Sequence, residues 1–500
     1  MHENARLFCC LTPVCFLLTF VLPKTKTNSR LKSSLLSFFT ALRKIDFSKW
    51  SILFVLAFVI IYAIEFGFYK RQDRVIASDV IHYYAYLPAA VIYKDLSLDF
   101  VFEDPGHFSK MFWPVNAPNG KHAFMVTMGM SILYAPAFFI THAIVSVSGG
   151  DTSGFSEPYR LGLVIMGWVY LFLALLMLRK VLLRYFSKNA TALSLIMVVI
   201  GTNLFHYATA ETTMSHQYSF FLFSAFLLLT IQWHEKPRLS KAILLGVVGA
   251  LITLVRPTNV LIGLIFVFWE TGSFSGIAEK LRLFGKQNRS ILMIVLSAII
   301  VWIPQFVYWK VFTGSWFFLG YGDNGASFFF DNPQIINNLF SYRKGWLVYT
   351  PLMVFAFVGL AMLWKRKRGM ALPILIFTVF NIYLVSSWWS WWYGGGFGMR
   401  AYIETYAIYA LGFAAFTDWV LESRFFVRIP LILIMLTLVG FSYFQTRQYY
   451  WGAIHYVGMT KEAYWYQFLV VKPYGDYYKK LTIPDMEKAR KGIYVYEPEE

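Results

Sequence analysis

The chain consists mainly of long apolar runs joined by short polar segments. Of its 500 residues, 58% are hydrophobic and only 14% carry a charge. A soluble globular protein needs more polar surface than this composition supplies, whereas about 20 consecutive apolar residues let an α-helix cross a bilayer. The chain is therefore predicted to be an all-α polytopic membrane protein.

About eleven runs have a length suited to a membrane-spanning helix. The first is at residues 52–68. The others lie at residues 161–178, 190–207, 218–233, 242–255, 260–269, 291–309, 346–364, 372–385, 401–420 and 429–444. The sequence thus predicts a bundle of about 11 transmembrane helices.

The net charge is +18, and the Lys and Arg residues stand in short clusters between the apolar runs. A nucleic-acid-binding protein would instead carry a basic face on a soluble domain, so no nucleic-acid partner is expected. Positive clusters between spans mark cytoplasmic loops. Those of this chain lie at residues 179–188, 236–241, 280–289, 365–368 and 424–428, each after an even-numbered run. One orientation, with a cytoplasmic N-terminus, satisfies all of them.

The apolar stretch 124–147 is not counted as a span, because a further span there would place every later basic cluster outside. It contains Gly129 and Pro136. We interpret it as an interfacial or re-entrant helix at the outer face.

Three regions follow from this topology. Residues 1–49 are the cytoplasmic N-terminal segment, in which Cys9, Cys10 and Cys15 offer no disulfide between loops. Whether residues 1–22 belong to the mature protein is left open. Residues 50–446 form the transmembrane module, with 69–159 as a large first external loop carrying interfacial helices. Residues 447–500 form an external tail, in which 451–468 are predicted to be a surface helix.

The stretch 78–88, in the first external loop, carries the strongest chemical signal. Ser78 suits a helix N-cap, and helical spacing then places Asp79, His82, Tyr83 and Tyr86 on one face. A carboxylate, an imidazole and two phenols can hold a hydroxyl substrate and take its proton. The alternative is an ordinary interfacial helix with aromatic rings at the lipid headgroups and a solvated Asp.

Other candidate residues fall on the same predicted side. Charged and imidazole groups near a span end are costly unless they line a wet cavity. Trp and Tyr suit stacking on sugar rings, although they also form aromatic belts at membrane interfaces. Arginine suits phosphate binding, although it also snorkels to the interface. The candidates are Glu211 and His216 with nearby His206, Arg256, Arg343 and Lys344, and Trp391, Trp392 and Tyr393 before Arg400.

Together these groups suit transfer of a sugar from a lipid phosphate. The lipid tail would stay in the bilayer with its phosphate near Arg400 or Arg256, and Asp79 would deprotonate an incoming hydroxyl. No nucleotide site is needed, and neither a P-loop nor a dinucleotide-binding glycine motif occurs.

Over roughly residues 52–400 the chain resembles the GT-C superfamily of polyprenyl-phosphate-sugar-dependent glycosyltransferases. The branch it resembles is that of protein mannosyltransferases and aminoarabinose transferases, family 39-like, with its Bacteroidetes-type relatives. Val80 stands where the mannosyltransferases carry Glu. The resemblance rests on Asp79 early in the first external loop, Tyr134-Ala135-Pro136, Arg160 at the start of a span, Thr212-Thr213-Met214-Ser215-His216, and Trp392-Tyr393-Gly394-Gly395 through Arg400.

The resemblance implies a GT-C-like bundle acting at the outer face of the bacterial cytoplasmic membrane. Asp79 would be the general base of an inverting transfer from a polyprenyl-phosphate-linked sugar to a glycan, lipid or protein. The resemblance makes no cofactor certain and leaves open a divalent metal between Asp79, Glu211 and His216. The candidate substrate-binding residues of this chain are His82, Tyr83, Glu211, His216, Arg256, Trp391, Trp392, Tyr393 and Arg400.

Other functions remain open. A transporter or flippase for a lipid-linked or anionic substrate would be expected to show inverted repeats and charges within spans, and we find no repeat. A polysaccharide polymerase or ligase would need its large external loop late in the chain. A non-catalytic scaffold is the third alternative.

Overall fold

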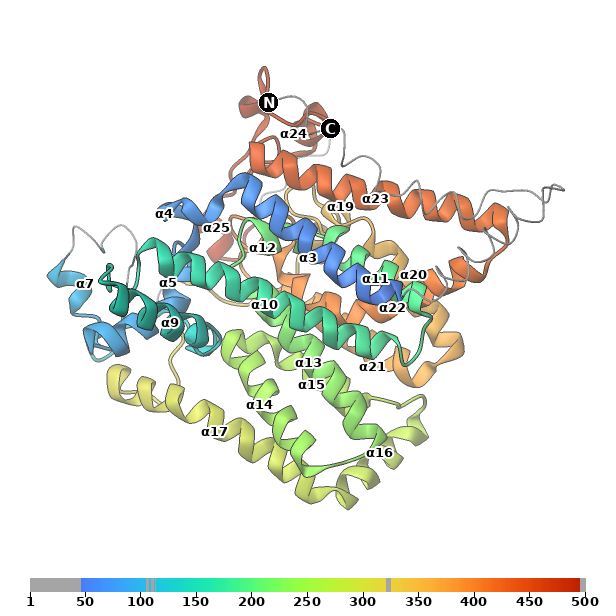
Figure 1. Cartoon of the computed structure of the whole chain (residues 1–500), viewed down its shortest axis with the longest axis horizontal. Coiled ribbons are helices and arrows are strands. Elements are labelled where there is room, and N and C mark those ends of the chain that lie inside the picture. Colours follow the sequence, from blue (N-terminus) through green and yellow to red (C-terminus); the bar gives the residue numbers. More distant parts are fainter. Residues whose placement is uncertain (1–45, 105–107, 109–111, 113, 321–324, 495–500) are drawn as a thin grey trace. The chain divides into compact units, whose positions relative to one another are not determined.

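Helices make up nearly all of the regular structure in the computed structural model (Figure 1). The structure describes residues 46–104, 108, 112, 114–320 and 325–494. The chain divides into two units, Met1–Phe47 and Ser48–Glu500, and nearly all of the described residues belong to the second. The three cysteines, residues 1–22 and residues 321–324 lie outside the described part, as does most of the predicted cytoplasmic segment 1–49.

Twelve helices of more than ten residues form the body of the second unit. They are α3 (Phe47–Phe66), α9 (Gly129–Ser148), α10 (Glu157–Leu182), α11 (Lys188–Ile200), α13 (Ser215–Glu235), α14 (Leu239–Val255), α16 (Phe274–Lys286), α17 (Asn288–Thr313), α20 (Met353–Arg366), α21 (Arg368–Ser386), α22 (Tyr406–Glu422) and α23 (Phe425–Trp451).

Shorter elements join them. The early ones are η2 (Phe68–Lys70), α4 (Gln72–Val75), α5 (Asp79–Tyr84), α6 (Tyr86–Pro88), the π-helical turn η3 (Ala89–Tyr93), α7 (Phe100–Glu103), and an antiparallel strand pair, β1 (Val115–Asn116) with β2 (His122–Ala123). The later ones are α12 (Leu204–Thr209), η4 (Pro257–Ile262), α15 (Gly263–Phe268), α18 (Ile335–Phe340), α19 (Trp346–Tyr349), η6 (Arg400–Thr405), α24 (Lys461–Tyr466), η7 (Tyr477–Lys480) and α25 (Met486–Arg490).

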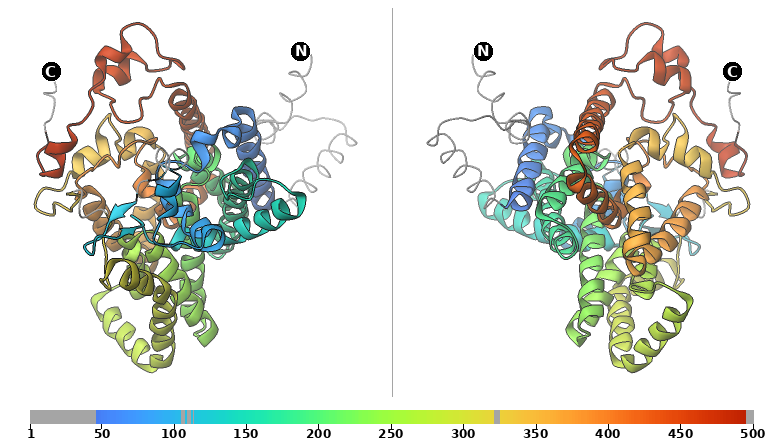
Figure 2. Two further views of the ribbon diagram at one scale, coloured as in Figure 1. Left: turned by 90° about the vertical axis from the view of Figure 1, so that its left-hand side faces the viewer. Right: turned by 90° about the vertical axis from the view of Figure 1, so that its right-hand side faces the viewer.

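Two helices, α13 and α22, lie at the centre of the packing. Both bury side chains on all sides, as helices without a polar face do. α13 contacts α10, α14 and η6, and α22 contacts α11 and α20. α14, α15, α16 and α17 lie together, along the lower side of Figure 1 and of both views in Figure 2.

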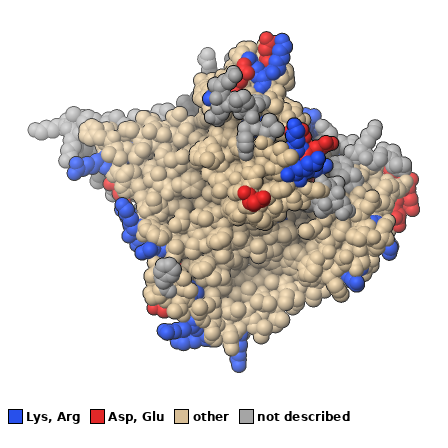
Figure 3. All heavy atoms as spheres, turned by 180° about the vertical axis from the view of Figure 1, so that it is seen from behind, with Lys and Arg blue, Asp and Glu red and all other residues tan. Residues whose placement is uncertain are grey.

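Six helices of the described part are long and apolar enough to cross a membrane: α3, α9, α10, α17, α21 and α23. α17 and α23 expose large apolar side chains, and the face in Figure 3 shows a broad band almost free of charged side chains. Such surfaces need a lipid neighbour. The chain is therefore an integral membrane protein with an all-α fold.

The predicted count of about eleven spans is not confirmed. Every predicted run falls on helical residues, but several are broken. The run at 346–364 is divided between α19 and α20, because Thr350 precedes Pro351 and a residue before proline disfavours the helical conformation. The run at 190–207 is divided after Ile200, and 260–269 is a 3₁₀ turn followed by six helical residues.

The helix ends that carry basic clusters lie together. Arg184, after α10, pairs with Glu235 at the end of α13 at 3.1 Å. Ser187 donates to Asp418, near the end of α22, at 2.5 Å. Lys367, between α20 and α21, lies 4.6 Å from the centre of the Tyr185 ring. One end of the bundle is thus rich in Lys and Arg, and its cytoplasmic orientation stays a prediction.

The helix α9 is among the six, although the sequence placed this stretch at the outer face. It packs mainly along α10, where Tyr170 donates to Leu133 O at 3.1 Å. Tyr134 also donates to Thr213 just before α13, and a Cβ on Gly129 would collide with Leu254 near the end of α14. Its place relative to a bilayer stays a prediction.

The C-terminal tail differs from the predicted surface helix at 451–468. Helix α23 continues to Trp451, and within the rest of 451–468 only Lys461–Tyr466 (α24) are helical. The tail packs on the body through a small apolar cluster in which Ile454, Met459 and Tyr464 meet Tyr349 and Phe397.

Two glycines allow α20 and α22 to approach closely. A Cβ on Gly359 would lie 1.8 Å from the carbonyl oxygen of Gly412, whereas a Cβ on Gly440 of α23 would meet nothing within 4 Å. We expect Gly359→Val to destabilise the protein by roughly 1–3 kcal/mol or more through overpacking. Thermal unfolding in detergent measures this. Gly440→Val is the matched control, and equal effects of the two substitutions would contradict the packing argument.

Candidate active site

Four candidate residues from distant segments meet at the bundle end opposite the basic clusters. Asp79 begins α5, Glu211 lies between α12 and α13, Arg256 ends α14, and Arg400 begins η6. The closest contact among them joins Arg400 Nη1 and Asp79 Oδ2 at 3.2 Å. The carboxylate that the sequence singled out therefore lies against the arginine that follows the Trp-rich segment.

The loop before Arg400 fixes the position of its guanidinium. Arg400 Nε donates to the carbonyl of Tyr393 at 3.0 Å. The backbone has positive φ at Tyr393 and Gly396, and a Cβ on Gly396 would lie 2.7 Å from the hydroxyl of Tyr207. Glycine is needed where backbone approaches this closely. The loop can therefore wrap around the Arg400 side chain.

Three side chains from other segments hold this loop. The hydroxyl of Tyr207 accepts a hydrogen bond from Phe397 N at 3.1 Å, and Asn203 Nδ2 donates to Phe397 O at 3.2 Å. Lys344 Nζ donates to the carbonyl of Gly396. Arg400 is thus placed by a backbone that is itself anchored.

A buried carboxylate, Glu404, forms a second centre one turn after Arg400. Its side chain is 1% exposed. It accepts a hydrogen bond from Arg256 Nη1 at 2.9 Å and from Asn259 Nδ2 at 3.3 Å, and His216 Nδ1 lies 3.5 Å away. The network connects η6 with the ends of α13 and α14, so it brings Arg256 and His216 to the same part of the molecule as Arg400.

The residues predicted on one face with Asp79 separate in the structure. Helix α5 ends at Tyr84, and Tyr86 belongs to α6, where its hydroxyl donates to Val126 O at 2.8 Å. His82 is buried, with its ring 5.3 Å from that of Phe112. Burial lowers the pKa of His82 to about 4. The backbone stays helical through Ala85, whose N–H donates to Ile81 O at 2.9 Å, and the side chains of the predicted face contact different partners.

Tyr83 is the member of that set that shares its electrostatic environment with the basic residues. It is buried, and it interacts with Asp79, Arg256 and Arg400. Ser78 occupies the N-cap position of α5, but its side chain makes no capping hydrogen bond and its φ is +49°. Residue 78 is therefore not the side-chain cap that the sequence predicted.

Glu211 lies against His206 rather than against Asp79. His206 Nε2 is 3.4 Å from Glu211 Oε1, and the Glu211 side chain is 29% exposed. Burial raises the pKa of Glu211, but the interaction with His206 and the charge of Arg400 outweigh it and lower the pKa below its ordinary value. Glu211 is therefore an anion at neutral pH.

The three candidate metal ligands do not form a metal site. Asp79 pairs with Arg400, Glu211 with His206, and His216 with Glu404. Within the described residues, no three His, Cys, Asp or Glu side chains are arranged to hold a metal ion. We derive no step through a metal.

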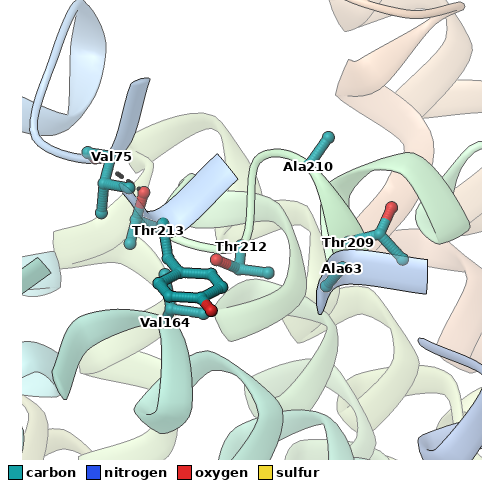
Figure 4. Close-up of a pocket in the computed structure, with 8 residues that line it drawn as sticks. Ala63, Val75, Val164, Thr209, Ala210, Thr212 and Thr213 are labelled. Atoms are coloured by element: carbon teal, nitrogen blue, oxygen red, sulfur yellow. Dashed lines mark hydrogen bonds between the residues drawn. The ribbon is translucent and has the colours of Figure 1, made fainter. Parts of the chain in front are cut away.

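The four tryptophans of the segment at 388–392 lie in different surroundings. Trp388 pairs with the backbone of Phe328, and the carbonyl of Trp389 accepts from Tyr494. Trp391 and Trp392 line a groove of about 1490 Å³. A second, small pocket, lined by Thr209, Ala210, Thr212 and Thr213 among others, holds only about 10 Å³ (Figure 4). That is the lower limit for one water molecule.

Sequence reasoning missed Glu404, Asn259 and Tyr207 as members of the site. Glu404 carried a usable signal, since an acid inside an apolar run requires a partner. Asn259 and Tyr207 carried none, because amide and phenol groups are common near span ends.

No family model and no curated protein matches the chain. Solved structures of the Archaeoglobus fulgidus oligosaccharyltransferase are similar to it. The apo form is 13% identical with a TM-score of 0.46, covering 90% of this chain and 62% of that one. AglB in complex with an inhibitory peptide and a dolichol-phosphate is 11% identical with a TM-score of 0.42, covering 91% and 62%. The complex with Zn and sulfate is 14% identical with a TM-score of 0.44, covering 89% and 59%.

This chain spans about three fifths of the length of the oligosaccharyltransferase chains it matches. The neighbours are named as oligosaccharyltransferases. At these scores the likeness says nothing about activity, which has to come from the residues of this chain.

Lys344 gives the site a pH dependence. Burial, helped by the charge of Arg400, lowers its pKa from 10.5 to about 7. Between these values the unfolded chain binds a proton that the folded chain does not, so stability rises with pH through this window. We expect Lys344→Met to reduce that rise by up to about 1.4 kcal/mol per pH unit.

Thermal unfolding in detergent from pH 7 to pH 9 measures the effect. Lys121→Met removes an exposed lysine in the β1–β2 turn and serves as the control. A slope in Lys344→Met equal to that of the unsubstituted protein would contradict the assignment.

Proposed function

We propose that the protein is an inverting glycosyltransferase. It moves a sugar from a polyprenyl-phosphate donor to an acceptor hydroxyl at the outer face of the bacterial cytoplasmic membrane. The observation that carries the proposal is the 3.2 Å contact between the Asp79 carboxylate and the Arg400 guanidinium. The contact places a base beside a phosphate-binding cation, and once a donor phosphate draws Arg400 away from Asp79 the two groups can act on opposite sides of one sugar carbon.

The transfer would be a single displacement. Asp79 takes the proton of the acceptor hydroxyl, whose oxygen forms a bond to the anomeric carbon. The bond from that carbon to the phosphate oxygen breaks, and the lipid phosphate leaves with the electron pair. Attack and departure on opposite faces of the carbon invert its configuration. Arg400 would neutralise the leaving phosphate, because guanidinium pairs with phosphate in a bidentate way.

Arg256 supports this role from the buried side of the site. Glu404 engages its Nη1 and leaves other guanidinium N–H groups for a ligand. Its side chain is 23% exposed and that of Arg400 is 17% exposed, so both reach the solvent-accessible rim. Two cations there suit the lipid phosphate that leaves, because its charge grows from one to two as the bond to the sugar breaks.

The contact between Asp79 and Arg400 also sets an order of events. While Arg400 holds Asp79, the carboxylate is a poor base because a neighbouring positive charge stabilises its ionised form. A donor phosphate competes for the same guanidinium. Donor binding would therefore release Asp79, and the base would become effective only with donor present.

Removing the base tests the function. We expect Asp79→Asn to lower sugar transfer by roughly 10²–10⁴-fold, the usual contribution of a general base, with expression intact. Transfer from a polyprenyl-phosphate sugar in purified membranes is the measurement. Asp99→Asn removes a carboxylate of the same loop as a control. The proposal would be wrong if neither the unsubstituted protein nor Asp79→Asn transferred sugar. Transport of the lipid-linked substrate by both proteins would then identify a transporter.

Arg400→Lys tests the phosphate contact. Lysine keeps the charge but cannot reach both the Tyr393 carbonyl and a phosphate with a planar fork. We expect kcat/KM to fall at least about tenfold, mainly through a higher KM for the donor. Arg447→Lys alters an exposed pair with Glu65 and should change little. An unchanged donor KM in Arg400→Lys would contradict the role.

A further inference from the structure

We propose that the groove lined by Trp391 and Trp392 binds an anionic oligosaccharide as the acceptor. This inference rests on the proposed glycosyl transfer, whose acceptor it assigns to a chemical class. The groove holds about 1490 Å³ and lies between α18 with the segment after it and the C-terminal tail. Small-molecule pockets usually hold about 300–1,000 Å³, so this groove suits a longer ligand.

Aromatic rings form much of the groove. Trp391 and Trp392 are buried in it, edge to face with ring centres 5.7 Å apart. Trp465 and Phe340 are 53% and 54% exposed, and Trp465 Nε1 donates to the hydroxyl of Tyr342 at 3.1 Å, which fixes its ring. Exposed faces of fixed aromatic rings suit stacking on the apolar faces of sugars.

One buried donor in the groove lacks an acceptor. Trp392 is 3% exposed, and its indole N–H makes no hydrogen bond within the part of the chain that the structure describes. Buried polar groups are nearly always hydrogen-bonded, and an unpaired one is costly. This N–H has almost no accessible surface, so it marks an unfilled donor behind the groove wall rather than a group that a ligand in the groove contacts directly.

Charge decides which class of sugar fits. Two acidic side chains, Glu462 and Asp485, line the groove. Both are already paired, Glu462 with Lys480 and Asp485 with Lys488 at 3.6 Å. The cations outnumber them: Arg343, Lys461, Lys479, Lys480 and Lys488. Lys479 also pairs with Asp476 at 2.7 Å, whereas for Lys461 no acidic partner is found among the described residues. A lining with this excess of positive charge attracts an anionic chain and gives a neutral one no such gain.

The residues that line the groove are continuous in the chain with the loop that holds Arg400, the partner of Asp79. Trp392 precedes Tyr393, whose carbonyl holds Arg400. Asn338 links the groove wall to η6. Its Nδ2 donates to Trp391 O at 3.0 Å, and its Oδ1 accepts from the Tyr402 hydroxyl in η6 at 2.5 Å. A glycan lying along the groove would therefore reach the loop that carries Arg400.

The test is a binding measurement on the full-length Asp79→Asn protein in detergent, so that turnover plays no part. Oligogalacturonate serves as the anionic probe and maltooligosaccharide of equal length as the neutral one. We expect oligogalacturonate to bind at least tenfold more tightly, and added salt to weaken it. Equal affinity for both probes, or no binding of oligogalacturonate, would overturn the proposal.

Matched substitutions locate the site. Trp465→Ala and Lys461→Glu change the groove, whereas Trp451→Ala and Lys472→Glu change a cation–π pair outside it, at 4.4 Å. We expect each groove substitution to weaken oligogalacturonate binding at least tenfold and the control pair to leave it within twofold. Thermal unfolding verifies that all four proteins are folded. Equal effects of the two pairs would reject the groove as the site.

Two further outcomes separate related failures. Loss of binding to phosphatidylglycerol vesicles in the groove variants, with oligogalacturonate binding unchanged, would assign the groove to the membrane surface instead. Binding is measured without turnover, so its absence rejects the acceptor class alone. Specific binding together with an inactive unsubstituted enzyme would count against the transfer reaction.

Discussion

The pairing of the buried Glu404 carboxylate is the interaction on which the site depends. A charge taken out of water costs several kcal/mol unless partners compensate for it. The partners of Glu404 are Arg256, which directly precedes η4, Asn259 within η4, and His216 at the start of α13. Glu404 and Arg400 both belong to η6. The pairing of the buried acid therefore also fixes the position of the Arg400 backbone.

The loop before Arg400 then fixes the guanidinium of Arg400 through the Tyr393 carbonyl. Asn203, Tyr207 and Lys344 hold its backbone at Gly396 and Phe397, and its glycines allow approaches that a side chain would block. A rigid loop has a chemical use here. A phosphate-binding arginine held by fixed hydrogen bonds loses less entropy on binding than a free surface arginine does.

Sequence reasoning reached the class of the protein and the convergence of Asp79 with Arg400, because hydrophobic run length and charge parity depend only on local sequence. It failed where long-range packing decides. The Tyr86 hydroxyl donates to Val126 O, a partner far away in the chain, and α19 ends before Pro351. The partners of Glu404 lie far away in the chain, so no spacing rule could name them. The groove depends on the tail, whose short helices follow from contacts with the body.

One segment, 391–400, takes part in both proposed binding events. Its tryptophans line the groove, and its last residue pairs with Asp79. Between them stands Tyr393, with its carbonyl on Arg400 and its hydroxyl donating to Val385 O at 3.1 Å. A donor phosphate that draws Arg400 away from Asp79 must strain or move that carbonyl, and a sugar chain against Trp392 acts on the adjacent residue. Linkage is reciprocal, so a donor that alters acceptor affinity has its own affinity altered by the acceptor by the same factor.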